Sequence, residues 1–373
     1  MVSVVHSLKP SSGEAEVLER LCAGLPDAAA TRAAAALALA RAAYGDKQVG
    51  TGEAVLQHAL GMALIVASLD LDADARVAAL LFAASDHVPD CGERLKTGFG
   101  DTVAGLVDGL HRLGSLRPLT RAAAGGGAGA GAGEMRTQTE ILRKMLLAMV
   151  DDIRVVMLRL ASRVQTLRFL NGRPGSLRDE MARESQLIYA PLANRLGIWH
   201  VKWELEDLSF RYLEPETYKR IATMLDEKRS EREGFIAAAV ERLKAELAAV
   251  GVAAEIAGRP KHIYSIWNKM RGKDIDFERV YDVRAVRIIV PEVRDCYTVL
   301  GIVHHLWQPI HGEFDDYISH PKGNYYRSLH TAVEVEDGRS LEVQIRTPEM
   351  HAHAELGVAA HWRYKESGAS VKA

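Results

Sequence analysis

The sequence predicts a protein of two domains, an all-α N-terminal half followed by an α+β C-terminal domain. Three observations support this prediction. The chain of 373 residues is long enough for about two domains of roughly 150 residues each. Apolar residues recur at helical spacing along most of the first 250 residues. Beyond them, short β-like runs alternate with helical segments.

The composition excludes several classes of protein. Hydrophobic residues make up 48% of the chain, an ordinary share for a globular protein, so general disorder is excluded. The 47 Lys and Arg against 49 Asp and Glu give a formal net charge of −2, which disfavours nucleic-acid binding by bulk charge. Three widely separated cysteines favour a reducing environment. We read no secretory signal and no run of about 20 apolar residues, so we expect a cytoplasmic protein without membrane contact.

Helix-forming patterns follow one another through the first half of the chain. The alanine- and leucine-rich run Ala28–Ala43 ends at Gly45, a residue that commonly stops a helix. The run Ala122–Gly133 contains only Ala and Gly and predicts a flexible loop. Further helices are predicted at Ala54–Leu69, Ala73–Ala84, Asp101–Leu113, Glu140–Met149 and Ile153–Leu170.

A helical stretch at Leu177–Leu213 and a long polar helix at Pro215–Val250 complete the helical part. We therefore expect an all-α domain over residues 1–200, connecting helices over 201–250 and the α+β domain over 251–373. In that domain the predicted strands are Val252–Ala257, Val283–Val290, Ser328–Val335 and Leu341–Ile345, and the predicted helices are Lys261–Met270, Arg294–Trp307 and Pro348–Tyr364.

The first of four segments with chemical potential is basic. From Arg259 to Lys273 there are five Lys and Arg and no acid. Lys261, Ser265 and Lys269 are four residues apart, so they share one face of the predicted helix. Two ammonium groups beside a helix N-terminus suit a polyphosphate. A solvated basic face is the alternative, and the apolar residues on the opposite face of the helix weaken it.

Two further segments place an acid beside an apolar strand. Asp282 stands at the start of the run Val283–Val290, and Glu342 alternates with apolar residues in the last predicted strand. Together the two carboxylates could form a magnesium site, whereas taken singly each could be a solvent-facing strand residue. Asp282 and Arg287 differ in parity, so they serve one site only if the strand is irregular or begins after Asp282.

The fourth segment combines acids with a turn-rich aromatic loop. Glu313, Asp315 and Asp316 precede residues 317–331, which contain Lys322, three tyrosines, an arginine and two histidines. An aromatic ring beside polar groups suits stacking on a nucleic base. A plain surface loop would explain the acids but not the aromatic and basic cluster.

With these segments in this order, the chain resembles the RelA/SpoT family of alarmone enzymes over nearly its whole length. The matching segments are Tyr189–Leu196, Trp199, Lys202–Leu208, Gly258–Met270, Tyr281–Arg287, Asn324–Thr331, Glu342–Thr347 and Ala354–Lys365. The resemblance implies a synthetase that transfers the β,γ-pyrophosphate of ATP to the 3′-OH of GTP or GDP. Its products would be pppGpp or ppGpp and AMP, made for the stringent response. It also implies a nucleotidyltransferase-like fold for the C-terminal domain.

The resemblance assigns roles to individual residues. Asp282 and Glu342 would bind Mg²⁺, and Glu342 would also help to deprotonate the 3′-OH. The residues assigned to ATP are Arg259, Lys261, Ser265, Lys269 and Arg287. The residues assigned to the acceptor GTP or GDP are Lys322, Asn324, Tyr326 and His330, with Tyr326 stacked on guanine.

The helical half resembles the HD hydrolase domain of the family, with most of its metal ligands replaced. That domain needs a His, a His-Asp pair and a later Asp around a manganese ion. His58 matches the first ligand, whereas Phe82 and Ala83 stand at the His-Asp pair and Ser162 stands at the last Asp. One ligand of four cannot hold a hydrolytic metal, so the resemblance implies a pseudo-hydrolase domain.

The acidic segment implies the same specialisation. Glu313, Asp315 and Asp316 resemble the Glu-x-Asp-Asp signature of monofunctional RelA-type synthetases, where bifunctional members have Arg-x-Lys-Asp. Long family members continue into regulatory domains that contact the ribosome and uncharged tRNA. The chain ends at Ala373, so we expect an N-terminal catalytic fragment whose ribosome and tRNA contacts belong to a missing C-terminal region.

Two alternatives remain open. A bifunctional synthetase/hydrolase would release pyrophosphate from ppGpp with Mn²⁺, and it would need Asp86 and His87 to supply missing ligands. A catalytically restrained nucleotide-binding regulatory module would bind GTP without forming AMP.

Overall fold

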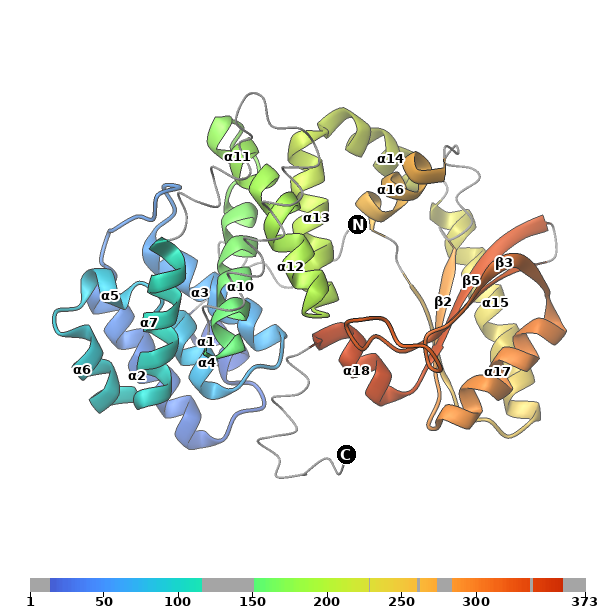
Figure 1. Cartoon of the computed structure of the whole chain (residues 1–373), viewed down its shortest axis with the longest axis horizontal. Helices are drawn as coiled ribbons and strands as arrows, with labels where there is room; N and C mark the ends of the chain where they lie inside the picture. The colour runs from blue at the N-terminus through green and yellow to red at the C-terminus, as the bar shows by residue number, and fades with distance from the viewer. Residues whose placement is uncertain are drawn as a thin grey trace. The chain divides into compact units, whose positions relative to one another are not determined.

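The computed structural model of the chain describes residues 14–115, 151–227, 229–259, 262–273, 284–335 and 338–357. The predicted loop Ala122–Gly133, the predicted helix Glu140–Met149, Lys261 and Asp282 lie outside these ranges. The chain divides into two compact units between Leu213 and Glu214. As predicted, the first unit is helical in its described part and the second combines helices with a mixed sheet (Figure 1).

The described part of the N-terminal unit consists of α-helices and one π-helical segment. These are α1 (Glu14–Cys22), α2 (Asp27–Tyr44), α3 (Val55–Ser68), α4 (Ala73–Leu80), α5 (Ala84–His87), α6 (Cys91–Phe99), α7 (Asp101–Ser115), α10 (Ile153–Phe169), α11 (Ser176–Glu184), the π-helical η1 (Ser185–Tyr189), α12 (Ala190–Arg195) and α13 (Trp199–Leu213).

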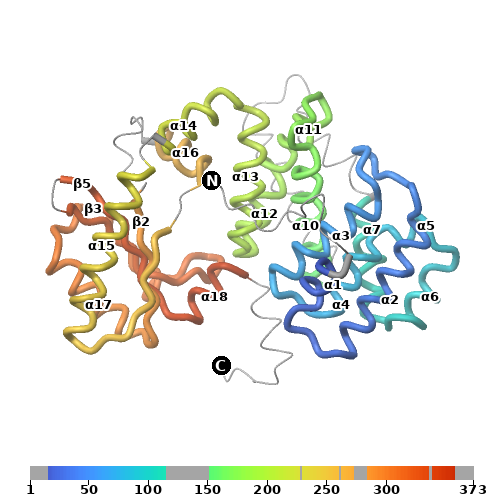
Figure 2. Tube along the Cα trace, turned by 180° about the vertical axis from the view of Figure 1, so that it is seen from behind, coloured from blue at the N-terminus to red at the C-terminus, as the bar shows by residue number. Residues whose placement is uncertain are grey.

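Helix α10 is the centre of this unit. It contacts α3, α4, α7, α11 and α13, and the trace from the opposite side shows the same neighbours around it (Figure 2). Leu158, Leu160 and Ala161 on this helix are fully buried. A helix that is apolar nearly all round needs such a central place, because each of its faces must be covered.

Gly61 allows α3 and α10 to approach closely. A Cβ atom at residue 61 would lie 2.2 Å from Oε1 of Gln165 on α10. A larger side chain would therefore displace Gln165, whose amide donates a hydrogen bond to Glu53 at 2.5 Å. The close packing brings His58 on α3 within 2.8 Å of Ser162 on α10.

The predicted helical stretch Leu177–Leu213 is divided into shorter segments. Pro191 lies in the first turn of α12, directly after the π-helical segment, because proline has no N–H to continue the helical hydrogen bonds. Gly197 then adopts a φ of +72°, which ends α12 and turns the chain into α13.

The C-terminal unit surrounds one five-stranded sheet in the order β1-β2-β5-β4-β3. Strands β2 and β5 are parallel, and the other pairs are antiparallel. Its elements are α14 (Pro215–Glu227), α15 (Arg229–Ala249), β1 (Glu255–Gly258), α16 (Ile263–Lys273), β2 (Ala285–Ile289), α17 (Val293–Leu306), β3 (Gln308–Asp316), β4 (Leu329–Val335), β5 (Arg339–Arg346) and α18 (Pro348–Leu356).

Helices α15 and α17 cover one face of this sheet (Figure 1). The core between them is apolar on every element that contributes to it. Its buried residues include Leu243 and Leu247 from α15, Val299 and Val303 from α17, and Val286, Ile288, Val343 and Ile345 from the strands. Alternation along β2 and β5 sends the intervening side chains to the opposite face, which is where polar residues gather.

Strand β3 was not expected from the sequence. It forms one edge of the sheet. For this segment the sequence predicted only a group of acids followed by a turn-rich loop. Exposed polar residues, Pro309 and Gly312 hide its periodicity, and the register shifts between Pro309 and Phe314. Proline and a register irregularity are both characteristic of edge strands.

No helix in the described ranges is long and apolar enough to cross a membrane.

Replacing Leu243 with Ala tests the core beneath the sheet. Leu243 is fully buried between α15 and the sheet, so Leu243→Ala should destabilise the C-terminal unit by about 2–5 kcal/mol in urea unfolding. The exposed Glu246 on the same helix provides the control, and Glu246→Ala should change the unfolding free energy by less than about 0.5 kcal/mol. Equal effects of the two substitutions would contradict the assigned face of α15.

Candidate functional site

The face of the sheet opposite α15 and α17 carries three of the predicted site residues, Arg287, His330 and Glu342. The parallel register pairs Arg287 on β2 with Gln344 on β5, and the antiparallel register pairs Gln344 with His330 on β4. Glu342 lies two residues before Gln344 on the same strand and therefore shares this face. Gln344 was not predicted as a site residue, although its alternation with Glu342 was a sufficient signal.

His330 links an aromatic ring to the predicted catalytic carboxylate. The hydroxyl of Tyr326 lies 2.8 Å from Nε2 of His330, and Nδ1 of His330 lies 3.8 Å from Oε1 of Glu342. The amide of Gln344 donates to the same carboxylate oxygen at 2.7 Å. The hydrogen bond from Gln344 positions this oxygen of Glu342, and the imidazole of His330 lies beside it.

Burial makes His330 a weak base. Burial is the largest cause of the shift that lowers the pKa of His330 to about 4, whereas the carboxylate of Glu342 acts to raise this pKa. The positive charges of Arg259, Lys322 and Arg346 lower this pKa further. The imidazole is therefore neutral at neutral pH and can accept a hydrogen bond from the neighbouring tyrosine hydroxyl.

Lys322 lies against two tyrosine rings in the loop before β4. Its Nζ is 4.1 Å from the ring centroid of Tyr317 and 5.5 Å from that of Tyr326. Burial lowers the pKa of Lys322, and Asp315 opposes this effect. The N–H of Tyr325 donates to the carbonyl of Lys322 at 2.8 Å, and Tyr325 has a φ of +61°. A left-handed aromatic residue is strained, and the strain lies where the loop presents Tyr326 to the site.

Glu355 on α18 gathers three basic side chains at the edge of the same face. Its Oε1 lies 3.2 Å from Arg287, 3.8 Å from Arg346 and 3.6 Å from Nδ1 of His351. Burial lowers the pKa of both Arg346 and His351. Glu355 was not predicted as a site residue, because its contact with Arg287 joins residues 68 positions apart and leaves no local pattern.

The other described residues that were predicted to bind ATP or the acceptor lie on α16, directly after β1 and in the loop before β4. Ser265 and Lys269 lie four residues apart on α16, so they share one helical face. Arg259 follows β1, and its N–H donates to the carbonyl of Ala285 at 2.8 Å, which holds it beside the start of β2. Asn324 accepts a hydrogen bond from the N–H of Tyr326 at 3.3 Å.

Strand β2 begins at Ala285, so the alternation of this strand does not extend to Asp282. Arg287 shares the face of Glu342 through the register of β2 and β5. Asp282 and Lys261 lie outside the described residues, so their roles in metal and phosphate binding stay predictions.

The acids of the predicted signature lie in β3, with two different orientations. Asp315 pairs with His330 across β3 and β4 and faces the polar side of the sheet. Asp316 accepts hydrogen bonds from the hydroxyl of Tyr297 on α17 at 3.0 Å and from the N–H of Ser319 at 2.8 Å. Burial would raise the pKa of Asp316, but these bonds outweigh it and lower that pKa. Asp316 therefore anchors the turn after β3.

In the N-terminal unit, the predicted remnants of a hydrolase site lie around His58. Its Nδ1 is 2.7 Å from Oε2 of Glu53 and its Nε2 is 2.8 Å from Oγ of Ser162. The ring of Phe82 lies 5.0 Å from the imidazole, centroid to centroid. Ala83 follows Phe82 and has no side chain that could bind a metal. Both ring nitrogens of His58 thus contact protein groups.

The neighbouring acid and histidine do not complete this site. Asp86 lies 3.5 Å from Nδ1 of His111 at an exposed position, and His87 packs edge-on against Tyr44. Over the described part of the chain, no group of three His, Cys, Asp or Glu is placed to hold a metal ion.

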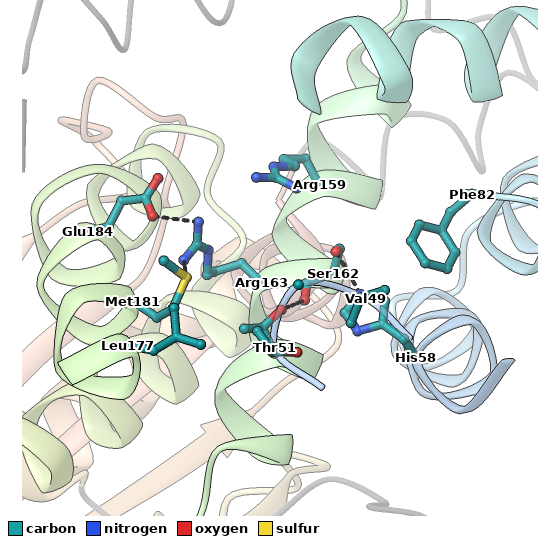
Figure 3. Close-up of a pocket in the computed structure, with 12 residues that line it drawn as sticks. Val49, Thr51, His58, Phe82, Arg159, Ser162, Arg163, Leu177, Met181 and Glu184 are labelled. Atoms are coloured by element: carbon teal, nitrogen blue, oxygen red, sulfur yellow. Dashed lines mark hydrogen bonds and ion pairs between the residues drawn. The ribbon is translucent and has the colours of Figure 1, made fainter. Parts of the chain in front are cut away.

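His58, Phe82 and Ser162 line a cavity of about 140 Å³ (Figure 3). Two arginines of α10, Arg159 and Arg163, line the same cavity. The structure therefore brings three of the four predicted remnants together, in a pocket whose chemistry is basic rather than acidic.

Comparisons with known proteins match both units. The signature described as "HD domain" matches residues 36–199, and the "Region found in RelA / SpoT proteins" matches residues 258–369. The chain is 46% identical over 316 residues to GTP pyrophosphokinase of Escherichia coli (strain K12), which covers 85% of this chain and 42% of that protein. It is 43% identical over 367 residues to GTP pyrophosphokinase of Haemophilus influenzae, covering 97% of this chain and 48% of that protein.

The chain is also similar to proteins named as hydrolases and to solved structures of alarmone synthetases. A guanosine-3′,5′-bis(diphosphate) 3′-pyrophosphohydrolase of Aquifex aeolicus is 40% identical over 352 residues, covering 94% of this chain and 48% of that protein. The solved small alarmone synthetase 1 from Bacillus subtilis is 28% identical with a TM-score of 0.28, covering 38% of this chain and 82% of that chain. Because this TM-score is low, the family assignment rests on the sequence matches.

Both units and both signatures define a protein that joins a helical HD domain to a mixed-sheet RelA/SpoT domain. The chain belongs to the RelA/SpoT family, which confirms the resemblance seen in the sequence. It spans about half the length of the curated relatives it matches.

The low pKa of His330 predicts an acid-sensitive C-terminal unit. His330 binds a proton near pH 6.5 in the unfolded state but only near pH 4 in the folded state. Its contribution to the free energy of unfolding is therefore complete above about pH 6.5 and is lost as the pH falls from about 6.5 to 4. The loss should reach up to about 3 kcal/mol. His330→Gln should reduce this loss in urea unfolding at pH 7.5, 5.5 and 4.5. A loss as steep as in the original chain would refute the assignment.

Proposed function

We propose that the chain is a GTP/GDP pyrophosphokinase that transfers the β,γ-pyrophosphate of ATP to the 3′-OH of GTP or GDP. The observation that best supports this proposal is the polar face of the sheet. There, Glu342, neutral His330 and the ring of Tyr326 lie in one connected set of contacts. The names of the pyrophosphokinase relatives support the same activity.

On the acceptor side, the proposed chemistry needs a stacked base and a proton acceptor. Tyr326 would stack on guanine, and Lys322, Asn324 and His330 would line the rest of the acceptor. Glu342 would accept the proton of the 3′-OH as its oxygen attacks the β-phosphorus of ATP. The bond between the β-phosphorus and the α,β-bridging oxygen then breaks, and AMP leaves with that oxygen.

On the donor side, charge and position matter more than covalent chemistry. Arg259 and Arg287 would contact the adenine, and Glu355 holds Arg287 in place through the 3.2 Å ion pair. The phosphates would lie along the basic helix face of Lys261, Ser265 and Lys269. The lysines of this helix face would neutralise the charge that develops on the leaving AMP.

A magnesium ion fits this donor set, because Glu342 offers the hard carboxylate oxygen that Mg²⁺ prefers and the substrates offer phosphate oxygens. Asp282 and Glu342 would hold the ion, which would supply charge neutralisation at the transferred phosphates.

Glu342→Gln tests the proposed proton acceptor. The amide keeps the size of the side chain but cannot accept the proton, so kcat should fall by about 10²- to 10⁴-fold in an assay with ATP, GTP or GDP, and Mg²⁺. Anion-exchange chromatography would measure AMP and the guanosine product together. Glu349→Gln, at an exposed position of α18, should leave turnover unchanged.

Two outcomes would contradict parts of this proposal. Unchanged turnover in Glu342→Gln would remove Glu342 from the reaction. If calorimetry shows GTP binding while the original chain forms no AMP, the chain is a restrained nucleotide-binding module in this form.

We further propose that the N-terminal unit has no metal-dependent hydrolase activity. His58 is the single predicted ligand that remains, and its Nε2 contacts Ser162 rather than open space. Phe82 places an apolar ring beside the imidazole. Relatives named as pyrophosphohydrolases exist in the family, so the activity requires a direct test.

Restoring the implied ligands would test this loss. The chain should release no pyrophosphate from ppGpp with Mn²⁺, whereas the combined variant Phe82→His, Ala83→Asp, Ser162→Asp should bind Mn²⁺ with at least about tenfold higher affinity in calorimetry. Pyrophosphate release by the original chain would instead establish a bifunctional enzyme.

We propose a cytoplasmic setting for this activity, since ATP and GTP or GDP are the substrates. Contacts with the ribosome and uncharged tRNA, which the family resemblance implies, would belong to regions outside this sequence.

A further inference from the structure

Tyr325, in the loop before β4, has a backbone conformation that disfavours a tyrosine. Its φ is +61°, in the left-handed region where an L side chain is crowded by its own backbone. Its N–H donates to the carbonyl of Lys322 at 2.8 Å, and the N–H of Lys322 donates to the carbonyl of Tyr326 at 3.2 Å. A tight turn followed by one left-handed residue usually has glycine at that residue. The loop is therefore less stable with tyrosine there than with glycine.

Contacts within the fold do not offset this cost. Tyr325 is 74% exposed, the largest exposure among the exposed large hydrophobic residues of the described chain. Over the described ranges, its hydroxyl forms no hydrogen bond and its ring contacts no other ring or cation. Residues held in strained backbone conformations cluster at ligand-binding sites, where the side chain serves the ligand rather than the fold.

The neighbouring Tyr326 differs in that its ring is largely covered. It is 8% exposed, and its hydroxyl lies 2.8 Å from Nε2 of His330. The ring of Tyr317 meets it edge-on at 6.1 Å, and Nζ of Lys322 lies 5.5 Å from its centroid. A base that stacks on Tyr326 would therefore meet a small part of a fixed ring, whereas the next residue in the same loop, Tyr325, has an open ring.

We propose that Tyr325 is a further acceptor-binding residue, whose exposed ring covers the guanine that rests against Tyr326. This inference depends on the proposed acceptor site and adds a residue to it. A purine has two faces, and each can stack on an aromatic side chain. Tyr326 would form the fixed wall of the base site, and Tyr325 would form its solvent side. The left-handed conformation would hold the second ring at this side before the nucleotide arrives.

Tyr325→Asn removes the ring and keeps the loop. Asparagine adopts the left-handed conformation more readily than tyrosine, so the urea midpoint of the C-terminal unit should stay the same or rise. GDP binding to the full chain, measured by isothermal titration calorimetry, should weaken at least about fivefold, because a base–aromatic stack is lost. Tyr325→Phe keeps the ring and should bind GDP within about twofold of the original chain.

Two further variants separate the ring from other effects. Tyr325→Gly also accepts the left-handed conformation, and it should weaken GDP binding as much as Tyr325→Asn does. Phe314→Ala is the matched control, because Phe314 is 46% exposed but packs edge-on against His304 of α17. This control should leave GDP binding unchanged. All the variants should bind α,β-methylene-ATP like the original chain, because the ring is assigned to the acceptor.

Steady-state assays distinguish this inference from the proposed reaction. Tyr325→Asn should raise KM for GDP and keep kcat, because the lost contact to the base is the same in the ground state and in the transition state. If the original chain binds GDP but forms no AMP, the proposed reaction is wrong, and the GDP affinities still decide the role of Tyr325.

Three results would overturn the inference while the proposed reaction stands. One is equal GDP affinity of Tyr325→Asn and the original chain. Another is an equal loss of GDP and α,β-methylene-ATP binding in Tyr325→Asn, and the third is a lower urea midpoint of that variant. The last two would show that the ring of Tyr325 supports the fold.

Discussion

The parallel pairing of β2 with β5 is the constraint on which the C-terminal site depends. This register aligns Arg287 with Gln344, and β4 adds His330 to the same row. A shift of one residue would turn the polar row towards α15 and α17 and expose the apolar row to solvent. The hydrophobic core therefore fixes the site as firmly as it fixes the fold, because both depend on the same alternation.

Within that frame, the site combines a neutral imidazole with several cations. Burial and the nearby positive charges keep His330 unprotonated, so the imidazole does not form a charged pair with the neighbouring Glu342. A protonated His330 would compete with a metal ion for the carboxylate. The same cations would attract the phosphates of two nucleotides, so the charge of the site is matched to the proposed ligands.

The sequence predicted both fold classes and most helices, because apolar periodicity survives in elements with one buried face. It failed where structure depends on distant contacts. Strand β3 is stabilised by pairing with β4 and carries polar residues on an exposed edge, so its own sequence contains no alternation to read. Glu355 is similar, because its ion pair with Arg287 exists only after α18 has folded against the sheet edge. Local patterns could locate Glu342 but could not show what positions it.

The pocket around His58 in the N-terminal unit shows how a few side chains set the charge of a site. Several carboxylates around an absent ion would repel one another, and their burial would be costly without it. Ala83 and Ser162, at the positions where the family resemblance places acids, remove that repulsion. The hydroxyl of Ser162 also satisfies the imidazole of His58 at 2.8 Å. Arg159 and Arg163 of α10 line the same cavity, and Glu184 accepts a hydrogen bond from Arg163 at 2.8 Å. Two guanidinium groups therefore face one carboxylate in the lining, so the cavity has the charge balance opposite to that of a cation site.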